Sequence, residues 1–367
     1  MTLNTAETLA MGKLLSVVAE YHASDLHLSV GNPPALRIQG ELRPMNDQPV
    51  VIPEFVQRLA ETWLNAEQQA QLEKNREVSI SYTFQDKTRF KIHLFYQEGH
   101  LSASLRHITE YIPTIEDLGL PDVARQFTSL DRGLVIFTGP ASSGRSTTAA
   151  AVLELINQTQ ERHIVTLENP IEYLFVDQRS VIEQREIGRD ALSFEQALES
   201  IEDEDADCVF ISSMHTPALI EAVLAVVNSG HLVFTIMDTA TTVKAIEQII
   251  YKFPTDRQEY IRPQLSDALA GVIAQTLVPR TDGGRVAATE ILIPTQAIRT
   301  IIRDGVIYQL HNILQTSREE GMISMDASLA ELVRSGQVSL EVAQKMAQDA
   351  NQFQAFLRGG MVNESSL

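Results

Sequence analysis

Cysteine is almost absent from this sequence, whose 367 residues include only Cys208. A single cysteine excludes an intramolecular disulfide framework, so the chain suits a reducing compartment and we expect it in the cytoplasm. Cys208 begins the apolar run CVFI, residues 208–211, and this setting favours a buried strand position.

Basic residues are also scarce. The chain has 29 Lys and Arg against 48 Asp and Glu, which gives a formal net charge of -19. Because proteins bind nucleic acids by neutralising phosphates with an excess of Lys and Arg, this balance argues against a nucleic-acid partner. A basic partner or a divalent cation fits such a charge better.

Long hydrophobic runs are missing as well. The longest uncharged run, residues 222–237, is too short and too polar to cross a bilayer, and no basic leader precedes an apolar segment at the N-terminus. We therefore expect no direct insertion into a membrane. Any association with a membrane would depend on a protein partner.

The first part of the chain has the pattern of a small α+β domain. Residues 7–22 carry apolar positions at helical spacing, and strand-like stretches follow at 35–45, 77–84 and 89–97. This pattern predicts an antiparallel sheet with one or two helices over residues 1–112.

A second domain is predicted after a short connection. Residues 113–122 contain two prolines and a glycine that interrupt any periodicity, so we predict a linker there. Over residues 123–359, apolar strands alternate with helical stretches, which predicts an α/β domain with a largely parallel sheet and helices on both faces. Its predicted strands are 134–139, 163–168, 208–213 and 231–237. From Thr255 onward we expect mainly helices, and we expect residues 360–367 to form a disordered tail.

The stretch GPASSGRSTT, residues 139–148, has the form of a phosphate-binding loop. It follows the predicted strand and precedes a helix-forming run, the setting in which the pattern G-x-x-x-x-G-K-[ST] binds ATP. We expect phosphates to be held by seven residues: Gly139, Ser142, Ser143, Gly144, Arg145, Ser146 and Thr147. The Ser146 hydroxyl has the position of the Mg²⁺ ligand. An ordinary glycine-bearing turn is the simpler alternative.

Two features of this loop and its surroundings weaken the prediction of hydrolysis. Arg145 stands where such loops carry lysine, and a planar guanidinium does not replace a compact ammonium between phosphate oxygens. Hydrolysis also needs an acid that positions the attacking water, usually at the end of an apolar strand beside the loop. The strand at 208–211 ends instead in Ser212 and Ser213.

Several further segments resemble the twitching-motility secretion ATPases, the motors that retract type IV pili. The similarity extends over nearly the whole chain and rests on nine segments: 23–44, 112–125, 183–188, 230–234, 274–280, 284–292, 297–303, 321–333 and the phosphate loop. The segment AIRTIIR, residues 297–303, is similar to the A-I-R-x-x-I-R motif of the retraction branch.

This resemblance implies a PAS-like N-terminal domain, a RecA-like ATPase domain and a hexameric ring beneath the inner-membrane platform protein of the pilus. It also implies ATP and Mg²⁺ as cofactors, a cytoplasmic protein peripherally attached to the inner membrane through the pilus machinery, and arginines of the N-terminal domain that reach the phosphates. Arg89 and Arg106 stand at the matching places, with a purely structural role as the alternative.

The departures from the family fall on its polar functional positions. Arg145 replaces the lysine of the loop, and Ser213 replaces the glutamate of the family's G-E-M-R-D run. Asn169 replaces the aspartate of the acidic box, which keeps Glu168, and Asp238 replaces the second histidine of the histidine box, which keeps His231.

Three hypotheses remain open at this stage. The chain is a ring-forming accessory or regulatory subunit that binds nucleotide weakly and does not hydrolyse it, either as a homo-hexamer or in a mixed ring with an active retraction ATPase. Alternatively, it is an active ATPase in which Glu168, Glu204 or Asp238 supplies the missing acid. The third hypothesis is an adaptor that uses the fold to bind the pilus machinery and never meets nucleotide.

Overall fold

The computed structural model divides the chain into two compact units. Residues 1–111 and 172–174 form the first, and residues 112–171 and 175–367 form the second. The structure describes residues 5–21, 23–38, 40–84, 88–108, 111–316 and 320–359. The tail predicted at 360–367 therefore lies outside the described residues.

The first unit contains a six-stranded antiparallel sheet with the order β3-β2-β1-β6-β5-β4. The strands are β1 (Asp25–Leu28), β2 (Ala35–Ile38), β3 (Glu41–Pro44), β4 (Glu77–Phe84), β5 (Thr88–Gln97) and β6 (His100–Ile108). The helices are α1 (Thr5–Glu20), α2 (Pro53–Trp63) and α3 (Ala66–Asn75). Side chains such as Phe90 and Leu105 are fully buried on the sheet face that packs with these helices. Because side chains alternate along a strand, Lys91 and Arg106 point to the other face.

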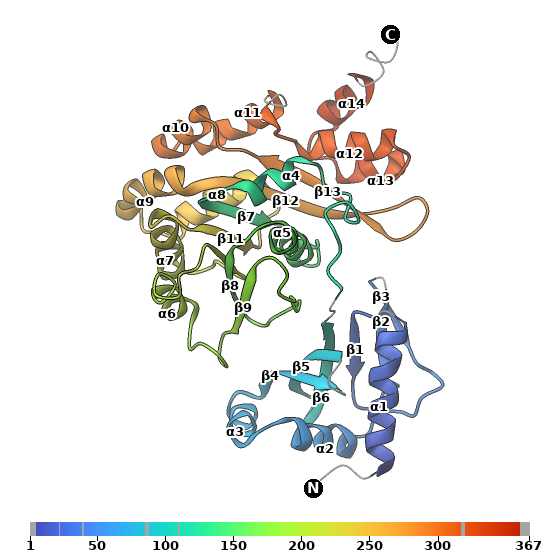
Figure 1. Cartoon of the computed structure of the whole chain (residues 1–367). Coiled ribbons are helices and arrows are strands. Elements are labelled where there is room, and N and C mark those ends of the chain that lie inside the picture. Colours follow the sequence, from blue (N-terminus) through green and yellow to red (C-terminus); the bar gives the residue numbers. More distant parts are fainter. Residues whose placement is uncertain are drawn as a thin grey trace. The chain divides into compact units, whose positions relative to one another are not determined.

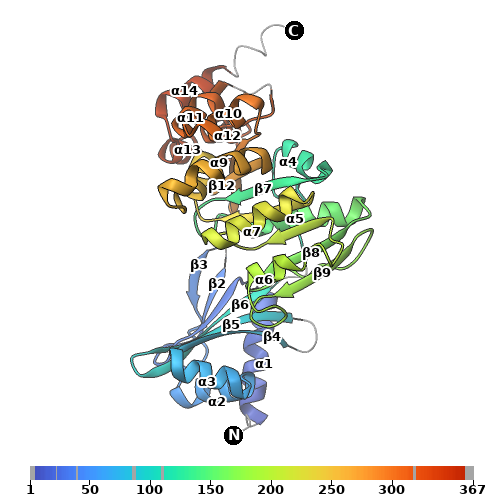
Figure 2. The same ribbon diagram turned by 90° about the vertical axis from the view of Figure 1, so that its left-hand side faces the viewer.

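The second unit is built on a seven-stranded sheet with the order β13-β12-β7-β11-β10-β8-β9. Its strands are β7 (Gly133–Thr138), β8 (His163–Glu168), β9 (Val181–Glu186), β10 (Cys208–Ile211), β11 (Leu232–Met237), β12 (Leu269–Pro279) and β13 (Arg285–Leu292). All neighbouring pairs are parallel except β12 and β13. Figures 1 and 2 show this sheet from two directions.

Helices cover both faces of the second sheet. On one face, Leu134 and Ile136 of β7 share a core with α6 (Phe194–Glu199), α7 (Pro217–Asn228), α8 (Thr242–Tyr251), α9 (Thr255–Ala268), α10 (Gln296–Asp304) and α11 (Leu310–Thr316). On the other face, Val135 and Phe137 pack with α4 (Val123–Gln126) and α5 (Arg145–Thr159). The predicted α/β fold class is confirmed.

A separate small core forms where the hairpin of β12 and β13 extends beyond the sheet. Val278 and Val286 pack there with α12 (Met325–Arg334), α13 (Leu340–Met346) and α14 (Ala350–Gly359). The expectation of mainly helices after Thr255 was incomplete because it omitted this hairpin. Its signal was present in the sequence, since β-branched residues flank the turn Asp-Gly-Gly at 282–284.

The segment predicted as a linker, 113–122, belongs to the second unit. Ile115 and Leu120 are 2% and 7% exposed, and both lie in the core that contains α5. These two apolar side chains, five residues apart, thus fix the segment to the core of the second unit. Its prolines and glycine prevent it from forming a helix or strand.

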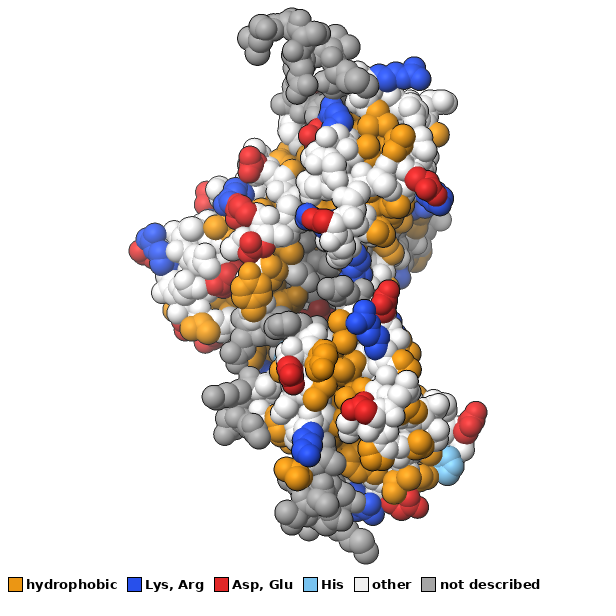
Figure 3. Space-filling view, turned by 90° about the vertical axis from the view of Figure 1, so that its right-hand side faces the viewer, with side chains coloured by type: hydrophobic (Ala, Val, Ile, Leu, Met, Phe, Trp, Pro, Cys, Tyr) orange, Lys and Arg blue, Asp and Glu red, His pale blue; other side chains and the backbone are white. Residues whose placement is uncertain are grey.

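Charges of both signs are mixed on the surface. On the face shown in Figure 3, acidic and basic side chains alternate and no large patch of one sign is seen. The net charge of -19 is therefore not concentrated on that face.

The packing around Gly271 gives a first prediction. A Cβ at this position of β12 would lie 2.1 Å from Cε1 of Phe127, in the core beneath α5. We expect Gly271→Ala to lower the free energy of unfolding by about 1–3 kcal/mol, the usual effect of overpacking. Chemical denaturation measures this change. Gly359→Ala is the control, since nothing lies within 4 Å of its added Cβ, and equal stability of the two variants would contradict the prediction.

Candidate functional site

The carboxyl ends of four parallel strands bring the candidate site together. Thr138 of β7 pairs with Met237 of β11, and Ile211 of β10 pairs with both Thr235 and Leu167. The phosphate loop, Ser213 and Asp238 follow directly after these strand ends. They therefore lie along one edge of the sheet, the edge where ligands bind in open α/β folds.

The phosphate loop has the backbone that its two glycines allow. Gly139 has φ 151° and Gly144 has φ 88°, and both values favour glycine. A Cβ on Gly139 would lie 2.3 Å from the carbonyl oxygen of Gln275, and one on Gly144 would lie 2.8 Å from Nε2 of the same glutamine. Ser142 also adopts a positive φ of 63°. The glycines are thus required by close packing against β12 as well as by backbone conformation.

Gln275 holds the loop from β12. Its Nε2 donates to the carbonyl oxygen of Ser143 at 2.7 Å, and its Oε1 accepts from the Thr148 hydroxyl at 2.7 Å. Gln275 and Thr148 are both almost fully buried. This role could not be predicted from the sequence, because Gln275 is distant from the loop in the chain and lies on a strand that was not predicted.

Helix α5 starts at the loop in the way that anion sites require. Gly144 is its N-cap and no side chain caps it, and the first amides of a helix have no acceptor within the helix. Ser146 and Thr147 lie in the first turn and are partly exposed. The buried Ser143 hydroxyl has no hydrogen-bond partner among the described residues. These residues fit the phosphates of a nucleotide, and Ser146, the predicted Mg²⁺ ligand, lies in the first turn of the helix.

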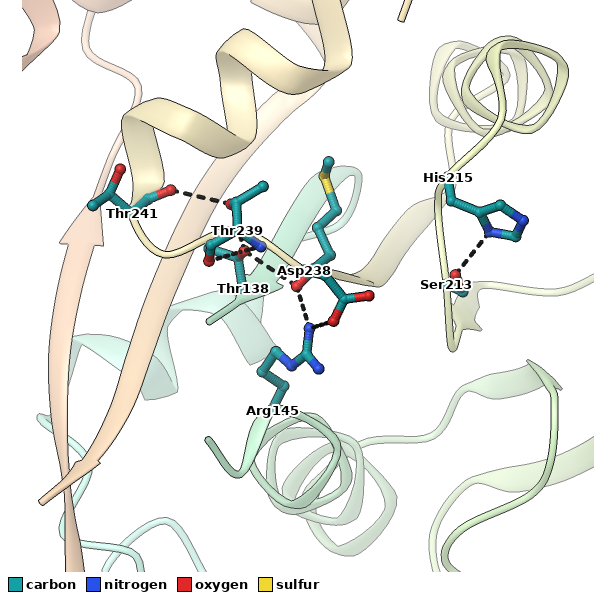
Figure 4. A network of polar contacts seen from close by, with 8 residues as sticks. Thr138, Arg145, Ser213, His215, Asp238, Thr239 and Thr241 are labelled. Atoms are coloured by element: carbon teal, nitrogen blue, oxygen red, sulfur yellow. Dashed lines mark hydrogen bonds and ion pairs between the residues drawn. The ribbon is translucent and has the colours of Figure 1, made fainter. Parts of the chain in front are cut away.

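Arg145 departs from this arrangement. Its Nη1 donates to the carbonyl oxygen of Met237 at 2.6 Å and forms an ion pair with Oδ1 of Asp238, as Figure 4 shows. The Arg145 side chain is 14% exposed, and the Asp238 side chain is 82% exposed. The cation of the loop is therefore already paired with a carboxylate of the chain itself.

The end of β10 carries hydroxyls in place of an acid. The Ser213 hydroxyl lies 2.9 Å from Nδ1 of His215, and the Ser212 hydroxyl accepts from the amide of Asn169 at 3.0 Å. Extending the strand register places Ser213 level with Met237. Residue 213, where the resemblance to the family places a glutamate, therefore lies at the same edge of the sheet as the loop.

The three candidate substitute acids are differently placed. Glu168, at the end of β8, is 4% exposed, and its Oε1 accepts from the Thr166 hydroxyl at 2.7 Å and from Gln184 at 3.2 Å. Asp238 is exposed but is paired with Arg145. Glu204, the third candidate, lies in the segment before β10, on the amino-terminal side of that strand, and pairs with Arg185.

Arg89 and Arg106 lie in the first unit on adjacent strands, β5 and β6, and point to the same sheet face. Arg106 is paired across the sheet with Asp25, whose Oδ1 accepts from its Nε at 3.1 Å. Within the second unit, His231 lies away from the loop. It precedes β11, roughly 20 Å along the strand from Asp238, and its ring contacts Ser229.

The motif AIRTIIR, residues 297–303, forms contacts between two helices of the second unit. Arg299 donates to the carbonyl oxygens of Ser266 and Asp267 at the C-terminus of α9, and Arg303 pairs with the Asp267 carboxylate at 3.0 Å. Burial lowers the pKa of Arg299. Cationic side chains stabilise the C-terminal end of a helix, so this motif joins α10 to α9.

Within the part of the chain that the structure describes, no group of three or more His, Cys, Asp or Glu side chains is placed to hold a metal ion. None of the described helices has the length and apolarity needed to span a bilayer.

The parallel sheet and the loop between β7 and α5 define an α/β fold of the phosphate-loop ATPase type. The chain belongs to the family of type II/IV secretion system proteins, whose model matches residues 7–353. It is 37% identical over 341 residues to the type IV pilus retraction ATPase PilT of Pseudomonas aeruginosa, covering 93% of this chain and 99% of that protein. The resemblance to pilus retraction ATPases predicted from the sequence is confirmed.

Two further relatives and a solved structure show the same similarity. PilU, a type IV pilus ATPase of Pseudomonas aeruginosa, is 32% identical, covering 96% of this chain and 92% of PilU. The uncharacterised protein YggR of Escherichia coli is 33% identical, covering 89% of this chain and 99% of YggR. The crystal structure of the pilus retraction motor PilT with bound ADP superposes with a TM-score of 0.84 at 37% identity, covering 94% of this chain and 99% of that one.

The anchoring of the loop by Gln275 gives a second prediction. Gln275→Leu leaves the Ser143 carbonyl and the Thr148 hydroxyl without this buried partner, so we expect a loss of about 1–3 kcal/mol in the free energy of unfolding. Chemical denaturation measures it. The exposed Gln296 provides the control variant Gln296→Leu, and a loss no larger than that of the control would contradict the anchoring role.

Proposed function

We propose that this chain is a nucleotide-binding, hydrolysis-impaired member of the pilus retraction ATPase family that acts as an accessory or regulatory subunit of the retraction machinery. Membership of the family is established by the similarity to PilT and PilU. The observation that carries the rest is the end of β10, where Ser213 stands in place of an acid and contacts His215.

Binding is supported by the parts of the site that remain. The loop keeps both glycines in their positive-φ conformations, its helix N-terminus is uncapped by side chains, and Ser146 occupies the first turn. We expect ATP and Mg²⁺ to bind through residues 139–147, as the ADP in the PilT structure suggests by analogy. Arg145 lowers the expected affinity because it is engaged by Asp238.

Loss of hydrolysis is supported by the surroundings of Glu168 and Asp238, the candidate acids that end or follow strands at the edge that holds the loop. A general base must reach the attacking water and must be unoccupied when it accepts the proton. Glu168 is buried and accepts hydrogen bonds from Thr166 and Gln184. Asp238 is held by Arg145. Loss of a positioned base typically lowers the rate by about 10²- to 10⁴-fold.

The expected setting is a ring at the pilus platform protein, in the cytoplasm and attached to the inner membrane through the pilus machinery. In this proposal the chain assembles as a homo-hexamer or enters a mixed ring with an active retraction ATPase, with Arg89 and Arg106 facing the nucleotide. The absence of a positioned acid favours the mixed ring, since an inactive subunit needs an active partner to affect retraction.

The experiment is a steady-state ATP hydrolysis assay of the purified chain with Mg²⁺. We expect the wild-type rate at background and a recovered rate in the double variant Arg145→Lys/Ser213→Glu, because the substitutions restore the loop ammonium and the acid at the end of β10. Adding Ser146→Ala to the double variant should abolish the recovered rate, which excludes a contaminating ATPase.

The alternative functions have distinct outcomes in this assay. Robust wild-type hydrolysis that is lost in Asp238→Ala or Glu168→Gln would establish an active motor with a substitute acid. Background rates in every variant, together with no thermal shift on adding ATP and Mg²⁺, would establish an adaptor that never meets nucleotide. Either outcome contradicts the proposed function.

A further inference from the structure

The pairing of Arg145 with Asp238 has a consequence for ligand selection. We propose that Asp238 is an internal anion that competes with nucleotide phosphates for Arg145, and that it thereby sets the affinity of the loop and its preference for nucleotides with fewer negative charges. This proposal rests on the proposed binding of nucleotide, and it adds a residue that determines specificity.

The position of the two side chains supports competition. Asp238 contacts the guanidinium through Oδ1, and its side chain is 82% exposed, whereas the Arg145 side chain is only 14% exposed. The carboxylate therefore lies toward solvent, and the guanidinium lies behind it. Figure 4 shows both beside the start of α5, where phosphates would approach the amides of the first turn.

Both partners are held in place by the main chain of the sheet. Arg145 also donates to the carbonyl oxygen of Met237, which fixes its guanidinium at the end of β11. Thr239, the residue after Asp238, is bonded to β7. Its amide donates to the Thr138 hydroxyl at 3.0 Å, and that hydroxyl donates to the Thr239 carbonyl oxygen at 2.7 Å. The pair thus joins two adjacent strand ends and is preorganised by them.

The burial of Arg145 distinguishes this pair from ordinary surface pairs. Arg280 and Asp282 form an exposed pair in the β12–β13 turn, with side chains 36% and 63% exposed. A largely buried cation needs a counter-charge, and in the absence of ligand Asp238 supplies it. A bound phosphate supplies the same counter-charge and makes the carboxylate a like-charged neighbour.

This competition predicts that the loop discriminates between nucleotides by their negative charge. A phosphate ligand must either displace the Asp238 carboxylate from Arg145 or bind beside it, and Coulomb repulsion in both cases grows with the negative charge of the ligand. ATP carries one negative charge more than ADP. The penalty is therefore larger for ATP, and the loop of this chain is expected to favour ADP more than a loop without the carboxylate would.

The test is a fluorescence titration of the full chain with labelled ATP and labelled ADP in the presence of Mg²⁺. Asp238→Asn removes the charge with almost no change of shape. We expect it to raise the affinity for ATP by about threefold to tenfold, the effect of one partly screened charge, and to raise the affinity for ADP by less. Asp238→Glu keeps the charge and should remain close to the wild type.

Asp282→Asn is the matched control. It removes one exposed aspartate from an arginine pair and makes the same change in net charge, but it lies in the β12–β13 turn. We expect its ATP and ADP affinities to equal those of the wild type. A thermal melt of each variant verifies folding, and a merely structural role of Asp238 would lower the melting temperature without changing the ratio of the two affinities.

Two results would overturn the inference. One is an Asp238→Asn variant whose ATP affinity is unchanged or reduced, since the carboxylate would then not compete with phosphate. The other is an equal gain for ATP and ADP, which removes the charge preference. Failure of the proposed function has a separate signature, which is ATP hydrolysis by the wild type. Absence of nucleotide binding in every variant overturns both proposals.

Discussion

The register between β7 and β11 is the constraint on which the candidate site depends. Thr138 and Met237 are paired across these parallel strands, so the loop after one strand and Asp238 after the other must leave the sheet side by side. The Thr138 hydroxyl reinforces this arrangement by bonding the main chain of Thr239. A shift of this register would separate Arg145 from its two acceptors, the Met237 carbonyl oxygen and the Asp238 carboxylate.

Packing and chemistry place different demands on the residues at this edge of the sheet. The loop retains its glycines because Gln275 approaches them closely, and such contacts serve the fold whether or not phosphate binds. The positions that act only during hydrolysis have no comparable role in packing. Ser213 and His215 satisfy each other by a hydrogen bond, so the loss of an acid there leaves no buried group unpaired.

The sequence predicted the elements that follow from short-range patterns. The strands β7, β8, β10 and β11, the loop at 139–148 and the α/β class were all expected, because apolar runs, glycine spacing and helix-forming residues are local signals. Contacts between residues far apart in the sequence were not predicted. Gln275 is 127 residues from Thr148, and nothing in either segment indicates their hydrogen bond. The ion pair of Arg145 with Asp238 spans 93 residues, and two substitutions that looked independent in the sequence proved to be partners.

Whether the site holds nucleotide without cleaving it can be measured in a single-turnover experiment. Excess protein is mixed with Mg²⁺ and ATP labelled at the γ-phosphate, and samples are taken over time. We expect bound ATP to be recovered intact at times when an active relative has released its label as phosphate. Release of the label from the bound ATP of this chain at the rate of that relative would contradict this expectation.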